Sequence, residues 1–132
     1  MYLCIGCLQS VKIYDVVEPT TKPYRVGGCP DCGSDVMRMD EIIAPAIIEL
    51  NRKGYKTEYS CSGHMKQDYL HTYIKFAKPP TACPKSFYID KNSIRPKNPE
   101  SVYWGIKRFD KIIKLNRDLY EWALSLPDLN GE

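Results

Sequence analysis

The chain has 132 residues, of which 43% are hydrophobic and 27% are charged. This composition is typical of a soluble globular protein and allows one compact domain or two small modules. The net charge of +3 is too small to indicate strong binding to nucleic acid or to a membrane surface. No apolar run is long enough to cross a bilayer and no signal segment opens the chain, so a cytoplasmic location is expected.

Four of the six cysteines form two C-x₂-C pairs near the start of the chain. Cys4 and Cys7 make the first pair, and Cys29 and Cys32 make the second pair after 21 intervening residues. Two thiolates at this spacing can reach one tetrahedral ion, whereas two disulfides would need an oxidising compartment. The spacing therefore predicts a structural Zn²⁺ bound by all four thiolates. Four thiolates complete the coordination shell, so a catalytic zinc is not expected.

The segment between the two cysteine pairs predicts a β-hairpin. Residues 11–17 contain four β-forming apolar side chains, residues 18–23 read EPTTKP and indicate a turn, and residues 24–26 lead back to the second pair. Two strands with a cysteine pair at each end are the layout of a zinc ribbon, here residues 1–38. The segment contains little apolar material, so the metal would supply much of its folding energy.

Residues 39–132 predict a second domain of the α+β class, with a small, mainly antiparallel sheet packed against two helices. The first helix is expected from Pro45 to Lys53, with Asp40 as a possible N-cap and Gly54 after its end. Alternating apolar residues predict strands at 55–60 and 69–77. Five prolines in residues 78–100 exclude a helix there, although a short strand is expected at 87–89.

A second helix of about twenty residues is expected before Pro127. Its apolar residues repeat every three or four positions and form one stripe, which also includes the polar residue Asn116. The positions of the stripe are Phe109, Ile112, Ile113, Asn116, Leu119, Tyr120, Ala123 and Leu126. This stripe is expected to face the core, and an oligomer interface is the alternative.

The loop predicted after the first of these strands concentrates reactive and polar side chains in the sequence SCSGH, residues 60–64. One interpretation is a second metal site formed by Cys61, His64, His71 and Cys83. A second is a Cys61 nucleophile with His64 as its base. A third is a ligand cradle in which Ser60, Ser62, Gly63 and His64 supply hydrogen-bond donors or charge, and a fourth is a simple turn.

A family resemblance favours a functional loop. The stretch IIELNRKGYKTEYSCSGHMK, followed by YIKF, resembles the core of the wybutosine-synthesising tRNA methyltransferase family. The matching positions are Thr57, Ser60, Cys61, Ser62 and Gly63, and His64 stands where that family usually has arginine. The chain also resembles small bacterial and bacteriophage zinc-ribbon proteins with a GYKT…SCSGH segment, for which no particular activity is implied.

Together these features predict a cytoplasmic, phage- or mobile-element-like zinc protein. Its loop, formed by Thr57, Ser60, Cys61, Ser62, Gly63 and His64, would bind a small-molecule or nucleotide-type ligand. One alternative is an S-adenosylmethionine-dependent RNA-modifying enzyme that uses the basic residues of 85–117, although no glycine-rich nucleotide motif is present. Another is a protein-interaction adaptor with a purely structural zinc, and a homo-oligomer is compatible with each function.

Overall fold

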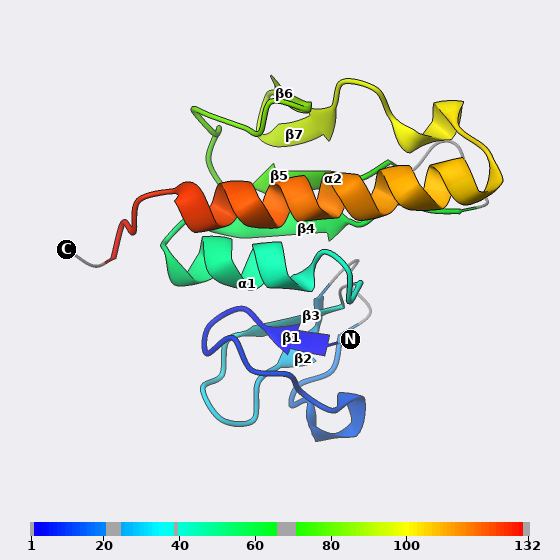
Figure 1. Cartoon of the computed structure of the whole chain (residues 1–132). Helices are drawn as coiled ribbons and strands as arrows, with labels where there is room; N and C mark the ends of the chain where they lie inside the picture. The colour runs from blue at the N-terminus through cyan, green and yellow to red at the C-terminus, as the bar shows by residue number, and fades with distance from the viewer. Residues whose placement is uncertain (1, 21–24, 39, 66–70, 131–132) are drawn as a thin grey trace. The chain divides into compact units, whose positions relative to one another are not determined.

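The computed structural model describes residues 2–20, 25–38, 40–65 and 71–130. The chain forms two compact units, Met1–Glu41 and Ile42–Glu132, each with its own antiparallel sheet (Figure 1). Both helices belong to the second unit, so the predicted α+β class is confirmed. Within the described ranges, no helix combines the length and the apolar character needed to cross a membrane.

The first unit is a three-stranded sheet that carries the paired cysteines at its strand ends. Its strands are β1 (Tyr2–Cys4), β2 (Arg25–Gly28) and β3 (Asp35–Arg38), in the order β1-β3-β2. β1 ends at Cys4, and Cys29 directly follows β2. The buried cluster of this unit is small and consists of Cys4, Val11, Val16, Cys29 and Val36.

The strand predicted at residues 11–17 is wrong. The chain instead makes a single turn of 3₁₀ helix, η1 (Ile13–Asp15), and only Val17 forms an isolated bridge, with Gly28. Val11 and Val16 are both buried in the same cluster. Residues five apart lie on opposite faces of a strand, so a turn between them is needed to bring both side chains to one side.

The second unit is a four-stranded antiparallel sheet with two helices. Its strands are β4 (Thr57–Cys61), β5 (Tyr73–Phe76), β6 (Phe87–Asp90) and β7 (Ser93–Pro96), in the order β4-β5-β7-β6. The helices are α1 (Ala44–Arg52) and α2 (Gly105–Ser125), and the 3₁₀ helix η2 (Glu100–Val102) precedes α2. In Figure 1, α2 crosses in front of β4 and β5 with α1 beside it. The core contains Ile47, Leu50, Ile74, Ile94, Leu115 and Leu119.

Two boundaries in this unit differ from the prediction. Residues 41–43 form a turn, so α1 begins at Ala44 with Ile43 as its N-cap, and Asp40 does not cap it. The proline-rich segment contains a hairpin of two strands rather than one. The sequence pattern did not predict β7 because Pro96 argues against a strand. The proline is tolerated at the last position of the strand, because the pairing of β7 with β5 covers only Ser93 and Ile94.

The apolar stripe predicted on α2 divides between the core and the surface. Ile112, Asn116, Leu119 and Ala123 are buried as expected. Phe109, Ile113 and Tyr120, however, are 45%, 37% and 39% exposed, so their assignment to the core is wrong. The buried face is completed by Arg108 and Leu115, which the pattern did not select. The reason is that a helix of this length rests on a sheet along one narrow line, so side chains at the edge of a wide stripe stay outside.

Candidate metal centre and the SCSGH loop

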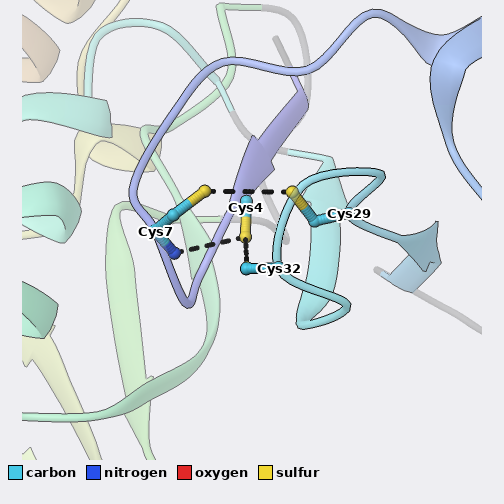
Figure 2. A group of neighbouring side chains, drawn as sticks. All are labelled: Cys4, Cys7, Cys29 and Cys32. Carbon is cyan, nitrogen blue, oxygen red and sulfur yellow. Dashed lines mark hydrogen bonds between the residues drawn. The ribbon is translucent and has the colours of Figure 1, made fainter.

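The four N-terminal cysteines lie together, with all Sγ atoms within 4.8 Å of one another. Figure 2 shows two of the sulfur pairs, Cys4–Cys32 with sulfurs 3.4 Å apart and Cys7–Cys29 with sulfurs 3.8 Å apart. Four thiolates about 2.3 Å from a tetrahedral Zn²⁺ are separated by about 3.8 Å from each other. The observed spacing therefore fits one metal ion at the centre of the group.

The backbone around each cysteine pair supports the same site. The N–H of Cys7 donates to Cys4 Sγ at 3.3 Å, and the N–H of Asp31 donates to Cys29 Sγ at 3.4 Å. Such bonds spread the negative charge of metal-bound thiolates. Gly33 has a φ of +79°, which lets its N–H turn back to the carbonyl of Cys29 at 2.9 Å and closes the second turn.

The thiols have unequal acidity. Burial raises the pKa of the Cys4 thiol to about 12. Hydrogen bonding from the side chain and then the backbone of Ser34 lowers the pKa of the exposed Cys32 thiol to about 6. Burial and hydrogen bonding thus act in opposite directions on these two candidate ligands, and a thiol must release its proton before it can bind a metal ion.

The predicted loop residues occupy different positions along β4. Thr57 lies at the start of the strand, where its hydroxyl accepts from Asn51 Nδ2 at 2.9 Å and its N–H donates to Asn51 Oδ1 at 3.2 Å. This pair ties β4 to α1. Ser60 and Cys61 form the other end of the strand, opposite Ile74 and Tyr73 of β5. The structure therefore brings Ser60–His64 together but places Thr57 three residues before Ser60 along the strand.

The backbone of Ser62 and Gly63 is engaged within the protein. The carbonyl of Ser62 accepts from Thr72 Oγ1 at 2.8 Å and from Asn116 Nδ2 at 2.9 Å. The N–H of Gly63 donates to Cys61 Sγ at 3.4 Å. Thr72 and Asn116 are both buried. The loop is thus held by Thr72, which directly precedes β5, and by Asn116 of α2.

Arg108 fixes the next part of the loop. Its side chain is 1% exposed, and its guanidinium donates to backbone carbonyls from both sides. On the loop side, Nη1 donates to the carbonyls of His64 at 3.4 Å and Met65 at 2.9 Å. Towards η2, the acceptors are Glu100, Ser101 and Tyr103, at 3.0, 3.2 and 3.0 Å. A planar group with five N–H donors suits this role, which a lysine could not fill.

A buried carboxylate lies beside Gly63. Glu100 is fully buried, and its Oε1 accepts from the N–H of Thr72 at 2.8 Å and lies 3.9 Å from His71 Nδ1. Three buried side-chain atoms have no hydrogen-bond partner in the described part of the chain: Glu100 Oε2, Asn116 Oδ1 and His71 Nδ1. An unmatched buried polar atom costs about 1–3 kcal/mol.

Cys4, Cys7, Cys29 and Cys32 are the only group of three or more potential ligands found in the described ranges. Cys61, His64, His71 and Cys83 do not form a second one, and Cys83 Sγ instead donates to the carbonyl of Phe87 at 3.4 Å.

Sequence reasoning missed Glu100 and Arg108, which lie far from the loop in the chain. Asn116 could have been found, because it is the one polar side chain in the predicted apolar stripe, and a polar residue at such a position needs buried partners. Comparisons of the sequence with models of protein families, with curated proteins and with solved structures found no significant match.

Proposed function

We propose that the protein binds one Zn²⁺ through Cys4, Cys7, Cys29 and Cys32, and that this ion holds a zinc-ribbon module together. The observation that carries the proposal is the convergence of four sulfurs within 4.8 Å of one another. Thiolate sulfur favours zinc over the hard cations Mg²⁺ and Ca²⁺, which take oxygen ligands.

A structural role follows from the small core of the first unit. Among the described residues of this unit, five form the buried cluster, and two of them are the cysteines Cys4 and Cys29. So little apolar area cannot offset the conformational entropy lost when a unit of this length folds. Structural zinc in small modules contributes about 10–16 kcal/mol of apparent binding free energy, which is enough to make folding depend on the metal.

The test is the metal content of the purified full chain, measured by elemental analysis beside a folding assay. The wild type should contain one zinc per chain. Cys7→Ser should lose the ion and the amide protection of residues 2–38, while Cys83→Ser, a matched control outside the group, should keep both. A zinc content unchanged by Cys7→Ser would contradict the proposal, and so would protection that persists after chelation.

We propose ligand binding at the SCSGH loop as a second function, because Glu100 and Asn116, which contact the loop residues Gly63 and Ser62, each carry an acceptor atom without a partner among the described residues. The loop N–H of Gly63 is already used by Cys61, and the nearest charged group is the carboxylate of Glu100. The free atoms Glu100 Oε2 and Asn116 Oδ1 are acceptors. A guest with N–H donors, such as the amino edge of a nucleobase, therefore suits this position better than a phosphate does.

Calorimetric titration with guanosine, adenosine and inorganic phosphate would test this preference. We expect a nucleoside to bind. Glu100→Gln should weaken this binding at least about tenfold, because the amide replaces one acceptor oxygen of the carboxylate by an N–H donor. Glu121→Gln, at an exposed position of α2, is the matched control. Binding of phosphate alone, or no effect of Glu100→Gln, would favour the anion cradle or a purely structural loop. An RNA-modifying activity and a phage-like origin stay predictions from the resemblance alone.

A further inference from the structure

Helix α2 exposes a second apolar stripe that its own core does not use. Ile106, Phe109, Ile113, Tyr120 and Leu124 are 75%, 45%, 37%, 39% and 49% exposed. At 100° per residue, the five positions fall within an arc of about 60° directly beside the buried face. Contiguous exposed apolar side chains of this size mark an interaction surface in a soluble protein.

The stripe has the spacing of a helix-packing seam. Ile106, Ile113 and Tyr120 are each seven residues apart, and the stripe from Ile106 to Leu124 is about 27 Å long at 1.5 Å per residue. A seven-residue repeat of apolar side chains keeps one face against a neighbouring helix along its whole length. The natural occupant of this surface is therefore another helix.

The charges along the stripe are arranged with opposite signs on either side of its centre. Asp110 lies three residues before Ile113, and Arg117 lies four residues after it. Both side chains are exposed. Turning this helix by two-fold symmetry about an axis near Ile113 brings Asp110 of each copy to within one residue of the position opposite Arg117 of the other copy.

We propose that α2 is the interface of a homodimer in which two copies pack antiparallel about a two-fold axis near Ile113. Ile113 then meets Ile113 of the second copy, and Ile106 meets its Tyr120. Asp110 pairs with Arg117 of the second copy, and the symmetry makes this ion pair twice. A closed two-fold interface requires a self-complementary surface, and the reversed charge order of this helix provides one. An unrelated partner would not impose such symmetry.

A charge exchange tests both the partner and the register. The mass of the full zinc-loaded chain would be measured by sedimentation and light scattering from micromolar to millimolar concentration. The wild type should dimerise. Asp110→Arg and Arg117→Asp should each weaken the dimer by about tenfold, because each replaces two attractive pairs by two repulsive ones. The double variant D110R/R117D should restore the dimer, since the exchanged charges again face their complements.

A packing variant adds an independent measurement. Ile113→Asp should abolish the dimer because it places two carboxylates at the two-fold axis, whereas Ile42→Asp, at an exposed apolar position before α1, should not. Circular dichroism would confirm that each variant is folded. A wild type that stays monomeric throughout this range would overturn the proposal and would leave the stripe to a different protein partner. A dimer that the double variant fails to restore would overturn the antiparallel register.

Discussion

Gly63 provides the sharpest test of how the SCSGH loop is held. It has a φ of +109°, and a Cβ at this position would lie 2.9 Å from Glu100 Oε1, 2.9 Å from Thr72 Oγ1 and 3.0 Å from Ile112 Cγ1. Glu100 and Thr72 are hydrogen-bonded to each other, and all three residues are buried, so none can move aside cheaply. Gly63→Ala therefore combines backbone strain with overpacking.

The expected loss can be worked from these two costs. A non-glycine residue in a sparsely populated backbone region costs about 1–3 kcal/mol. Overpacking of a closed site adds about 1–3 kcal/mol. The free energy of unfolding of the second unit should fall by about 2–6 kcal/mol in total. Gly105→Ala is a matched control, because Gly105 also has a positive φ, +57°, but no atom lies within 4 Å of the position of its Cβ. It should lose only about 1–2 kcal/mol.

Urea unfolding followed by tryptophan fluorescence would measure both variants. The two tryptophans, Trp104 and Trp122, belong to the second unit, so the signal reports its unfolding and not that of the first unit. The urea concentrations at the midpoints of unfolding give the differences in free energy of unfolding between the proteins, provided that the dependence of this free energy on urea has the same slope in each protein. Equal losses for Gly63→Ala and Gly105→Ala would refute the close packing of the loop against Glu100 and Thr72, and with it the buried carboxylate as a partner of the loop.

Three further variants test the metal centre and two buried cations. Ser34→Ala should return the pKa of Cys32 from about 6 towards its ordinary value. Protons then compete with zinc for this thiolate at pH 7, so the zinc affinity, measured by competition with a chelator, should fall about tenfold. Above about pH 9 the difference should vanish, because the thiolate then predominates in both proteins; a loss unchanged there would refute this cause. Arg108→Lys should lower the free energy of unfolding, measured in urea, by about 2–4 kcal/mol, since a lysine leaves some of the backbone carbonyls around Arg108 without a donor. An unchanged urea midpoint would contradict this role of Arg108. Lys53 donates to the carbonyls of Ala123, Leu124 and Leu126 at 2.7–2.8 Å, so Lys53→Met should speed amide exchange in the last turn of α2. Equal exchange in both proteins would exclude that role.

Local patterns were sufficient where one segment decides its own conformation. The period of the apolar residues located α2, although not all of its core positions, and Gly54 follows the end of α1 with a φ of +97°, as its place in the sequence indicated. The same patterns failed where a distant contact decides. The turn at Ile13–Asp15 exists because Val11 and Val16 must share one small core, which no β-propensity of that segment reveals.

By itself, the sequence determined which cysteines belong together, because the C-x₂-C spacing is a local property of one tight turn and two such turns can share one ion. It also determined the α+β class from the order of its elements. Only the tertiary structure placed Glu100, Arg108 and Asn116 around Ser62 and Gly63, since these residues lie 37–54 positions further along the chain and meet through the packing of α2 on the sheet. The same packing decided which half of the α2 stripe is buried and which half is exposed, because the line along which a helix contacts a sheet depends on all of the strands beneath it.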